Sequence, residues 1–96
     1  MAAKIHQATT NLIFKMHFDQ ELNTRGLKCP LPILKCKKSL AELSPGQVLK
    51  AYATDNGAVK DFQAFCKQTG HIMISLEETK EGDTSVYIFH IQKKAA

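Results

Sequence analysis

The 96-residue sequence has no tryptophan, only three prolines and five glycines, and few aromatic residues, at 7%. This composition excludes collagen-like and proline- or glycine-rich low-complexity chains. Apolar runs are short, because none approaches the ~18 residues that a membrane-spanning helix needs. The first residues also lack the apolar core of a signal peptide. We therefore expect a cytoplasmic protein that makes no membrane contact.

The sequence has few cysteines, and their spacing forms no regular pairs. The three cysteines are an odd number with no CxxC spacing, which argues against a disulfide-stapled secreted domain and for a reducing compartment. The three cysteines and four histidines also lack the close paired spacing of zinc ligands. We expect no metal and no cofactor.

The composition that is present is that of a small globular protein, with 44% hydrophobic and 23% charged residues. We expect one domain over residues 16–96, preceded by an N-terminal extension, residues 1–15, that is loose or lengthens the first strand. The net charge of +4 is compatible with an acidic partner surface or a nucleic acid and does not choose between them.

Residue patterns predict six elements. Alternation from Leu12 to Leu22 predicts a first strand, surest over His17–Leu22. Helical spacing, alternation and turn residues predict the others, which are a helix at Pro30–Leu43, a strand at Gln47–Thr54, a helix at Ala58–Thr69 ended by Gly70, and strands at His71–Glu78 and Thr84–Ile91. This order predicts an α+β (α/β) two-layer βαβαββ sandwich, with both helices on one face of a four-stranded mixed sheet. Two βαβ crossovers predict parallel pairs, and the last two strands predict an antiparallel hairpin.

The stretch Lys28-Cys29-Pro30 is the strongest chemical signal in the sequence. Proline is favoured at the first helical position, so Pro30 is predicted to begin the helix and Cys29 to be its N-cap. The helix dipole, Lys28 and Arg25 would then favour a thiolate and lower the pKa of Cys29. A buried structural cysteine is the alternative. Cys36 and Cys66 fall on apolar stripes, and we expect both in the core.

The run from Leu22 to Pro32, LNTRGLKCPLP, resembles the signature of the TusA/SirA-like sulfur-carrier family, with its CPxP motif. The stretches 53–57, 61–62 and 69–71 resemble later blocks of that family. The resemblance implies the βαβαββ fold and a persulfide on Cys29. It implies sulfur uptake from a cysteine desulfurase or another carrier and delivery to an acceptor protein, in tRNA thiolation, molybdenum-cofactor synthesis or sulfur metabolism. Asn23 departs from the family, which usually has Asp there.

Several residues around the cysteine are expected to support it or to dock its partners. Asp55 or Asn56 is also a candidate cap for the second helix. The basic side chains of the first helix are expected to attract an acidic partner surface. The supporting residues are Arg25, Gly26, Lys28, Pro30, Pro32, Asp55 and His71, and the docking residues are Lys35, Lys37 and Lys38.

A monomeric carrier that acts stoichiometrically with its partners is the leading interpretation, and two others stay open. A nucleic-acid-binding domain fits the basic charge, but Phe62, Phe65 and Phe89 are expected in the core and not as exposed stacking platforms. A thiol-based regulatory domain would need a resolving cysteine within reach of Cys29. Because the three phenylalanines are expected in the core, we expect no direct contact with nucleic acid.

Overall fold

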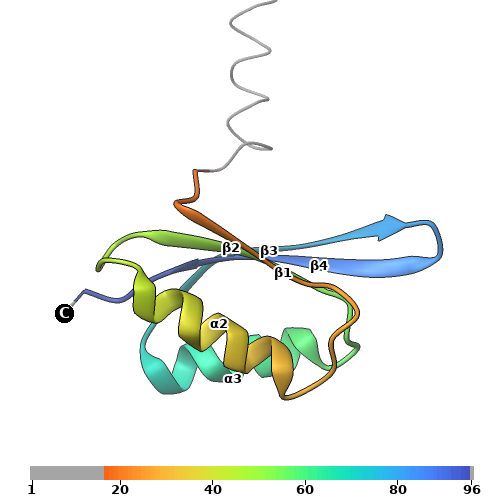
Figure 1. Cartoon of the computed structure of the whole chain (residues 1–96), viewed down its shortest axis with the longest axis horizontal. Helices are drawn as coiled ribbons and strands as arrows, with labels where there is room; N and C mark the ends of the chain where they lie inside the picture. The colour runs from red at the N-terminus through yellow and green to blue at the C-terminus, as the bar shows by residue number, and fades with distance from the viewer. Residues whose placement is uncertain (1–16, 96) are drawn as a thin grey trace, which may run out of the picture.

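Four strands form one mixed sheet, and two helices cover one of its faces (Figure 1). The computed structural model describes residues 17–95. The elements in chain order are β1 (Gln20–Thr24), α2 (Leu31–Glu42), β2 (Val48–Ala53), α3 (Ala58–Thr69), β3 (Ile72–Glu81) and β4 (Thr84–Gln92). The predicted two-layer βαβαββ sandwich is confirmed. No helix in this part of the chain is long and apolar enough to cross a membrane.

The strand order is β1-β2-β4-β3, and it corrects one part of the predicted topology. β1 and β2 pair in parallel, whereas β4 runs antiparallel to both β2 and β3. The second βαβ crossover was expected to give another parallel pair, and that prediction was wrong. β4 folds back into the place beside β2, where its registers run from Val48↔Gln92 to Ala53↔Tyr87.

The ends of the elements differ from the predicted ends by a few residues. The part of the predicted first strand before His17 lies outside the described residues, and β1 itself begins at Gln20. α3 has the predicted bounds, and Gly70 ends it with a φ of 87° that favours glycine. Its N-cap is Gly57, without a side-chain hydrogen bond. The prediction that Asp55 or Asn56 caps α3 was therefore wrong.

Apolar side chains from the two helices and from the helix-facing side of β2 and β4 form the core. Phe62 stacks on Phe89, with ring centroids 4.2 Å apart and an interplanar angle of 6°. Both predicted structural cysteines are in this core, since Cys36 is 0% and Cys66 6% exposed. These residues fix α2 and α3 on the sheet, and they therefore fix the loops that precede both helices.

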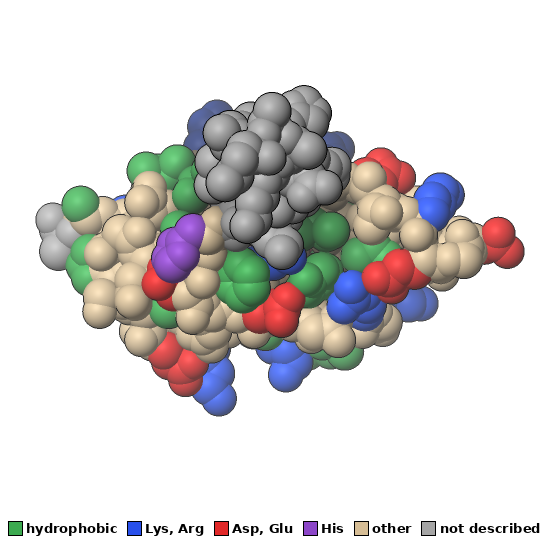
Figure 2. Space-filling view, turned by 90° about the horizontal axis from the view of Figure 1, so that it is seen from above, with side chains coloured by type: hydrophobic (Ala, Val, Ile, Leu, Met, Phe, Trp, Pro, Cys, Tyr) green, Lys and Arg blue, Asp and Glu red, His purple; other side chains and the backbone are tan. Residues whose placement is uncertain are grey.

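The outer face of the sheet, which lies away from the helices, is built differently. Lys50 and Tyr52 alternate with buried residues of β2 and lie on this face. The ammonium of Lys50 lies 5.1 Å from the centre of the Phe18 ring and 5.3 Å from that of Tyr52. Figure 2 looks onto this face and shows charged side chains gathered toward the β3–β4 hairpin. His90 lies here at 3% exposure, with Nδ1 2.9 Å from the Ser75 hydroxyl.

Candidate functional site

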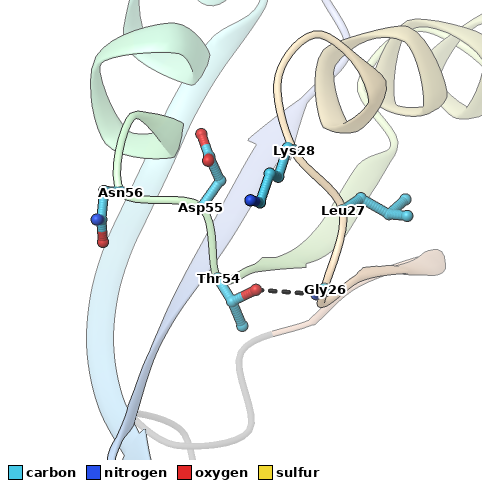
Figure 3. A pocket seen from close by; sticks show the side chains of 6 residues that line it. All are labelled: Gly26, Leu27, Lys28, Thr54, Asp55 and Asn56. Atoms are coloured by element: carbon cyan, nitrogen blue, oxygen red, sulfur yellow. Dashed lines mark hydrogen bonds between the residues drawn. The ribbon is translucent and has the colours of Figure 1, made fainter.

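Two loops meet at the end of the sheet where β1 and β2 finish. Because these strands are parallel neighbours, the loops that lead into α2 and α3 leave the same edge of the sheet. The Gly26 N–H donates to the Thr54 hydroxyl at 2.9 Å and ties the loops together. A hollow of about 220 Å³ lies between them, and Figure 3 shows its lining residues: Gly26, Leu27, Lys28, Thr54, Asp55 and Asn56.

The turn before the cysteine is held by its own polar groups. The side-chain oxygen of Asn23 accepts from the backbone N–H of Arg25 at 3.0 Å and from Arg25 Nη1 at 3.1 Å. The N–H of Leu27 donates to the Thr24 carbonyl at 3.1 Å. Gly26 has a φ of 79°, in the left-handed region where a Cβ is costly. Asn23 thus makes the turn hydrogen bonds expected of Asp or Asn at such a position.

The guanidinium of Arg25 also contacts groups outside this loop. It makes a bidentate pair with Glu81 at the end of β3, at 3.0 and 2.9 Å. Its Cζ lies 4.2 Å from the centre of the Tyr52 ring on the outer face of the sheet. Arg25 therefore fastens the end of β1 to the β3–β4 hairpin. We predicted that it would lower the pKa of Cys29, and the structure assigns it a structural role instead.

Cys29 is exposed, and α2 begins at Leu31, one residue later than the predicted start at Pro30. The N-cap of α2 is Pro30, whose carbonyl accepts from the N–H of Leu34 at 3.1 Å. The Cys29–Pro30 peptide bond is cis. Pro32 is buried in the first turn, where a missing N–H costs nothing. Cys29 is therefore not the N-cap, so the helix dipole acts on it from a greater distance than we predicted.

The pKa of Cys29 is raised, which overturns the prediction of a lowered one. The largest cause is a side-chain hydrogen bond between the thiol and the carboxylate of Asp61, followed by desolvation and by the negative charges of Asp61 and Asp55. A carboxylate that accepts from a thiol favours its protonated form. Lys28 is the neighbour of Cys29 in sequence, yet it does not reverse the shift. Cys29 is thus an exposed thiol in an acidic surrounding.

Asp61 is a site residue that the sequence reasoning missed. It lies in the first turn of α3, and α3 follows the strand that pairs in parallel with β1. This relation was the available signal, because the starts of two such helices lie at the same end of the sheet. Asp55, which was predicted as a site residue, lies in the same loop cluster, and its carboxylate accepts from the N–H of Gly57 at 3.2 Å.

His71 lies at the other end of α3 from these residues. A 12-residue helix is about 18 Å long, and His71 follows its last turn. Its Nδ1 accepts from the backbone N–H of Lys94 at 3.1 Å. Burial, followed by the charges of Lys94 and Lys93, lowers the pKa of His71. The structure does not bring His71 to Cys29, and its supporting role at the thiol stays a prediction.

An exposed face of α2 begins directly after the cysteine. Residues three and four positions apart lie side by side on a helix, so Leu31, Leu34, Lys35 and Lys38 form one face, which we call the docking face. Leu31 is 46% and Leu34 54% exposed, and both lysines are exposed. Lys37 is two positions from Lys35 and lies on the opposite side of α2 from it, next to Leu34 at the edge of the docking face. The three predicted docking lysines therefore do not share a face, and two exposed leucines went unrecognised in the sequence.

The other two cysteines, Cys36 and Cys66, are buried. Burial raises the pKa of Cys36 to about 12, with a small addition from Cys66, and burial also raises the pKa of Cys66. Neither thiol ionises readily, so neither competes with Cys29 as a nucleophile. Within residues 17–95, no group of three or more His, Cys, Asp or Glu side chains is placed to hold a metal ion.

Comparisons with known proteins agree on one family. The family model described as "Sulfurtransferase TusA" matches residues 20–93. A sulfur carrier protein TusA from Allochromatium vinosum is 61% identical over 67% of this chain and 80% of its own length. A putative sulfur carrier protein from Neisseria meningitidis is 48% identical over 74% of this chain and 95% of its own. The crystal structure of a SirA-like protein from Desulfitobacterium hafniense shares the fold, with a TM-score of 0.60 and 19% identity over 79% of this chain and all of that one.

Proposed function

The chain belongs to the TusA sulfurtransferase family, and we propose that it is a sulfur carrier that holds sulfur as a persulfide on Cys29. The observation that carries this proposal is the difference among its three thiols. Cys29 is exposed beside a hollow at the start of α2, whereas Cys36 and Cys66 are buried. A thiol that takes sulfur from one protein and passes it to another must be reached by both.

The chemistry is thiol exchange. The Cys29 sulfur bonds to the outer sulfur of a donor persulfide, and the sulfur–sulfur bond of the donor breaks. Its electron pair leaves with the donor cysteine, which gains the proton that Cys29 loses. Sulfur delivery repeats the same exchange with an acceptor. One sulfur atom moves in each exchange, without net oxidation or reduction, so no cofactor is needed on this chain.

The partners are a cysteine desulfurase or another carrier as donor, and an acceptor protein of a sulfur relay. The destinations that fit such a carrier are tRNA thiolation, molybdenum-cofactor synthesis and sulfur metabolism. The reducing cytoplasm suits a chain whose three cysteines are free. The docking face of α2 adjoins Cys29, and its apolar centre with two lysines fits a partner surface that is apolar with an acidic rim.

The test is sulfur loading followed by intact-protein mass. After incubation with a cysteine desulfurase, pyridoxal phosphate and L-cysteine, the protein should gain the mass of one sulfur atom, and a reducing thiol should remove it. Cys29→Ser should abolish the gain, whereas Cys66→Ser is the matched control that retains it. Loading that persists in Cys29→Ser would contradict the proposal. Several donors, including other carriers, belong in the test.

A further inference from the structure

Two side chains of opposite charge line the hollow between the loops that lead into α2 and α3. Lys28 comes from the first loop and Asp55 from the second, and the hollow between them has a volume of about 220 Å³. Figure 3 shows both side chains in the gap between the loops, with Lys28 reaching from its own loop toward that of Asp55. Within residues 17–95, neither of them belongs to an ion pair. The hollow therefore presents one ammonium and one carboxylate to the same space.

The backbone on both sides of this hollow is held by hydrogen bonds. The Gly26 N–H donates to the Thr54 hydroxyl at 2.9 Å, across the two loops. The Lys28 carbonyl accepts from the N–H of Leu31 at 2.9 Å. On the other side, the Asp55 carboxylate accepts from the N–H of Gly57 at 3.2 Å, which orients it. The two charges are thus placed before a ligand arrives, and such preorganisation favours binding.

The size and the charges of the hollow define the ligand that fits it. Sites for drug-sized molecules have volumes of ~300–1,000 Å³, so this smaller hollow suits a single small molecule. An α-amino acid carries an ammonium and a carboxylate on one carbon atom, which matches the two charges of the hollow. Building on the carrier function proposed above, we propose that the hollow binds the zwitterionic end of a small amino-acid persulfide, such as cysteine persulfide, as a sulfur donor to Cys29. The ligand carboxylate contacts Lys28 and its ammonium contacts Asp55.

The hollow adjoins the carrier cysteine through both of these residues. Cys29 directly follows Lys28, so their Cα atoms are about 3.8 Å apart across a trans peptide bond. The charge of Asp55 also reaches the thiol, since it is one of the causes that raise the pKa of Cys29. A persulfide held between Lys28 and Asp55 therefore has its sulfur atoms in the neighbourhood of Cys29.

The transfer step is a thiol exchange with the bound ligand. The Cys29 sulfur bonds to the outer sulfur of the persulfide, and the sulfur–sulfur bond of the ligand breaks. The electron pair leaves on the inner sulfur, which takes the proton that Cys29 loses, so the products are a persulfide on Cys29 and a free amino-acid thiol. The ligand ammonium also offsets the negative charge of Asp55, which favours the attacking thiolate.

Binding is tested with a probe that cannot transfer sulfur, S-methyl-L-cysteine, added to the Cys29→Ser protein. The backbone amide NMR signals of Gly26, Thr54 and Asn56, which line the hollow, should shift as the probe binds. Two further probes each lack one charge: 3-(methylthio)propionate has no ammonium, and 2-(methylthio)ethylamine has no carboxylate. Both should need a several-fold higher concentration for the same shift. Equal binding of the three probes, or no shift at the hollow, would overturn the proposal.

Variants then assign the two charges. Lys28→Gln and Asp55→Asn should each weaken binding of S-methyl-L-cysteine several-fold, and asparagine keeps an acceptor for the N–H of Gly57. Lys67→Gln and Asp83→Asn are the matched controls, because they remove the same charges from the last turn of α3 and from the β3–β4 turn, and they should bind the probe as the parent protein does. Equal losses in the controls would contradict a defined site.

Sulfur loading from freshly prepared L-cysteine persulfide, without a protein donor, tests the transfer. Intact-protein mass should show one added sulfur on Cys29, at a rate that falls several-fold in Lys28→Gln and Asp55→Asn. Unchanged rates would overturn the donor role. Slower loading of these variants from a desulfurase alone would assign the hollow to a protein partner, and this too would overturn it. Failure of the carrier function is distinct, because it would appear as sulfur loading that does not depend on Cys29, whereas probe binding needs no thiol.

Discussion

The ring of Phe62 in α3 stacks on the ring of Phe89 in β4, with centroids 4.2 Å apart. Both side chains are 0% exposed, and their contact joins the helix layer to the middle of the sheet. Through this contact, the core holds the start of α3, and with it Asp61, against the sheet.

Phe62→Ala should destabilise the protein by about 3–5 kcal/mol, because it removes a buried ring and leaves a cavity. Urea unfolding followed by circular dichroism measures the loss. Leu34→Ala is the control, since Leu34 is 54% exposed and its removal should cost no more than about 0.5 kcal/mol. Equal losses in the two variants would mean that the aromatic stack does not carry the core.

The three cysteines should differ in their reactivity toward iodoacetamide, and replacing them should change the stability of the protein to different extents. Iodoacetamide should label Cys29 in the folded protein and should reach Cys36 and Cys66 only after unfolding, because burial raises the pKa of both buried thiols. Cys36→Ser should cost about 1–3 kcal/mol if its hydroxyl finds no partner in the core, whereas Cys29→Ser should cost little. Peptide mapping after labelling, together with urea midpoints, checks both statements. Labelling of Cys36 ahead of Cys29 would contradict them.

Gly26→Ala should destabilise the turn before Cys29. Nothing lies within 4 Å of the position its Cβ would take, so the cost comes from the positive φ of 79°, and we expect about 1–2 kcal/mol. Thermal unfolding measures it. Gly57→Ala is the comparison, because Gly57 has a φ of −87°, and its effect should instead appear in the ionisation of Cys29 through the neighbouring carboxylates. A Gly26→Ala variant that is as stable as the wild type would mean that the turn relaxes to another conformation.

Charge reversal on the docking face should slow sulfur loading. Lys35→Glu with Lys38→Glu should reduce the initial rate from a desulfurase several-fold and weaken its salt dependence, since such charges act mainly on association. Lys37→Glu is the matched control on another side of the same helix and should have a smaller effect. Equal effects of Lys37→Glu and Lys35→Glu would argue for overall charge and against a defined face. Mass spectrometry over time provides the rates.

His90 should make stability depend on pH. Burial, and then the charge of Lys50, lowers the pKa of His90 from 6.5, against a smaller opposing effect of Glu77. As pH falls through about 6.5, the unfolded chain takes up the proton first, so the folded state loses stability from there down to the lower folded pKa, and above pH 6.5 His90 contributes no such loss. Urea unfolding at several pH values should show a shallower loss in His90→Gln. Parallel curves for the two proteins would contradict this.

The sequence predicted the fold well because its signals were local. Period-two alternation, helical spacing and Gly70 located five elements within a few residues, and the order of elements implied two layers. The place of β4 between β2 and β3 was not predictable in this way, because strand order depends on pairing between distant segments. The same dependence on distant segments explains why the groups around Cys29 were not predicted. Local order at Lys28-Cys29-Pro30 drew attention to the cysteine, but the carboxylates that raise its pKa, Asp55 and Asp61, come from the loop before α3 and from α3 itself, more than 25 residues away in sequence.

The central position of β4 also sets the order in which the sheet can be completed. β4 pairs with β2 on one side and with β3 on the other. Neither β2 nor β3 can therefore pair with β4 until residues 84–92 have left the ribosome. Before then, β1, α2 and β2 can assemble as one local unit, while β2 has one row of N–H and C=O groups unpaired. Such an edge can pair with other nascent chains. β4, which comes after the other three strands of the described sheet in the sequence, is therefore the strand that completes the sheet and ends this exposure.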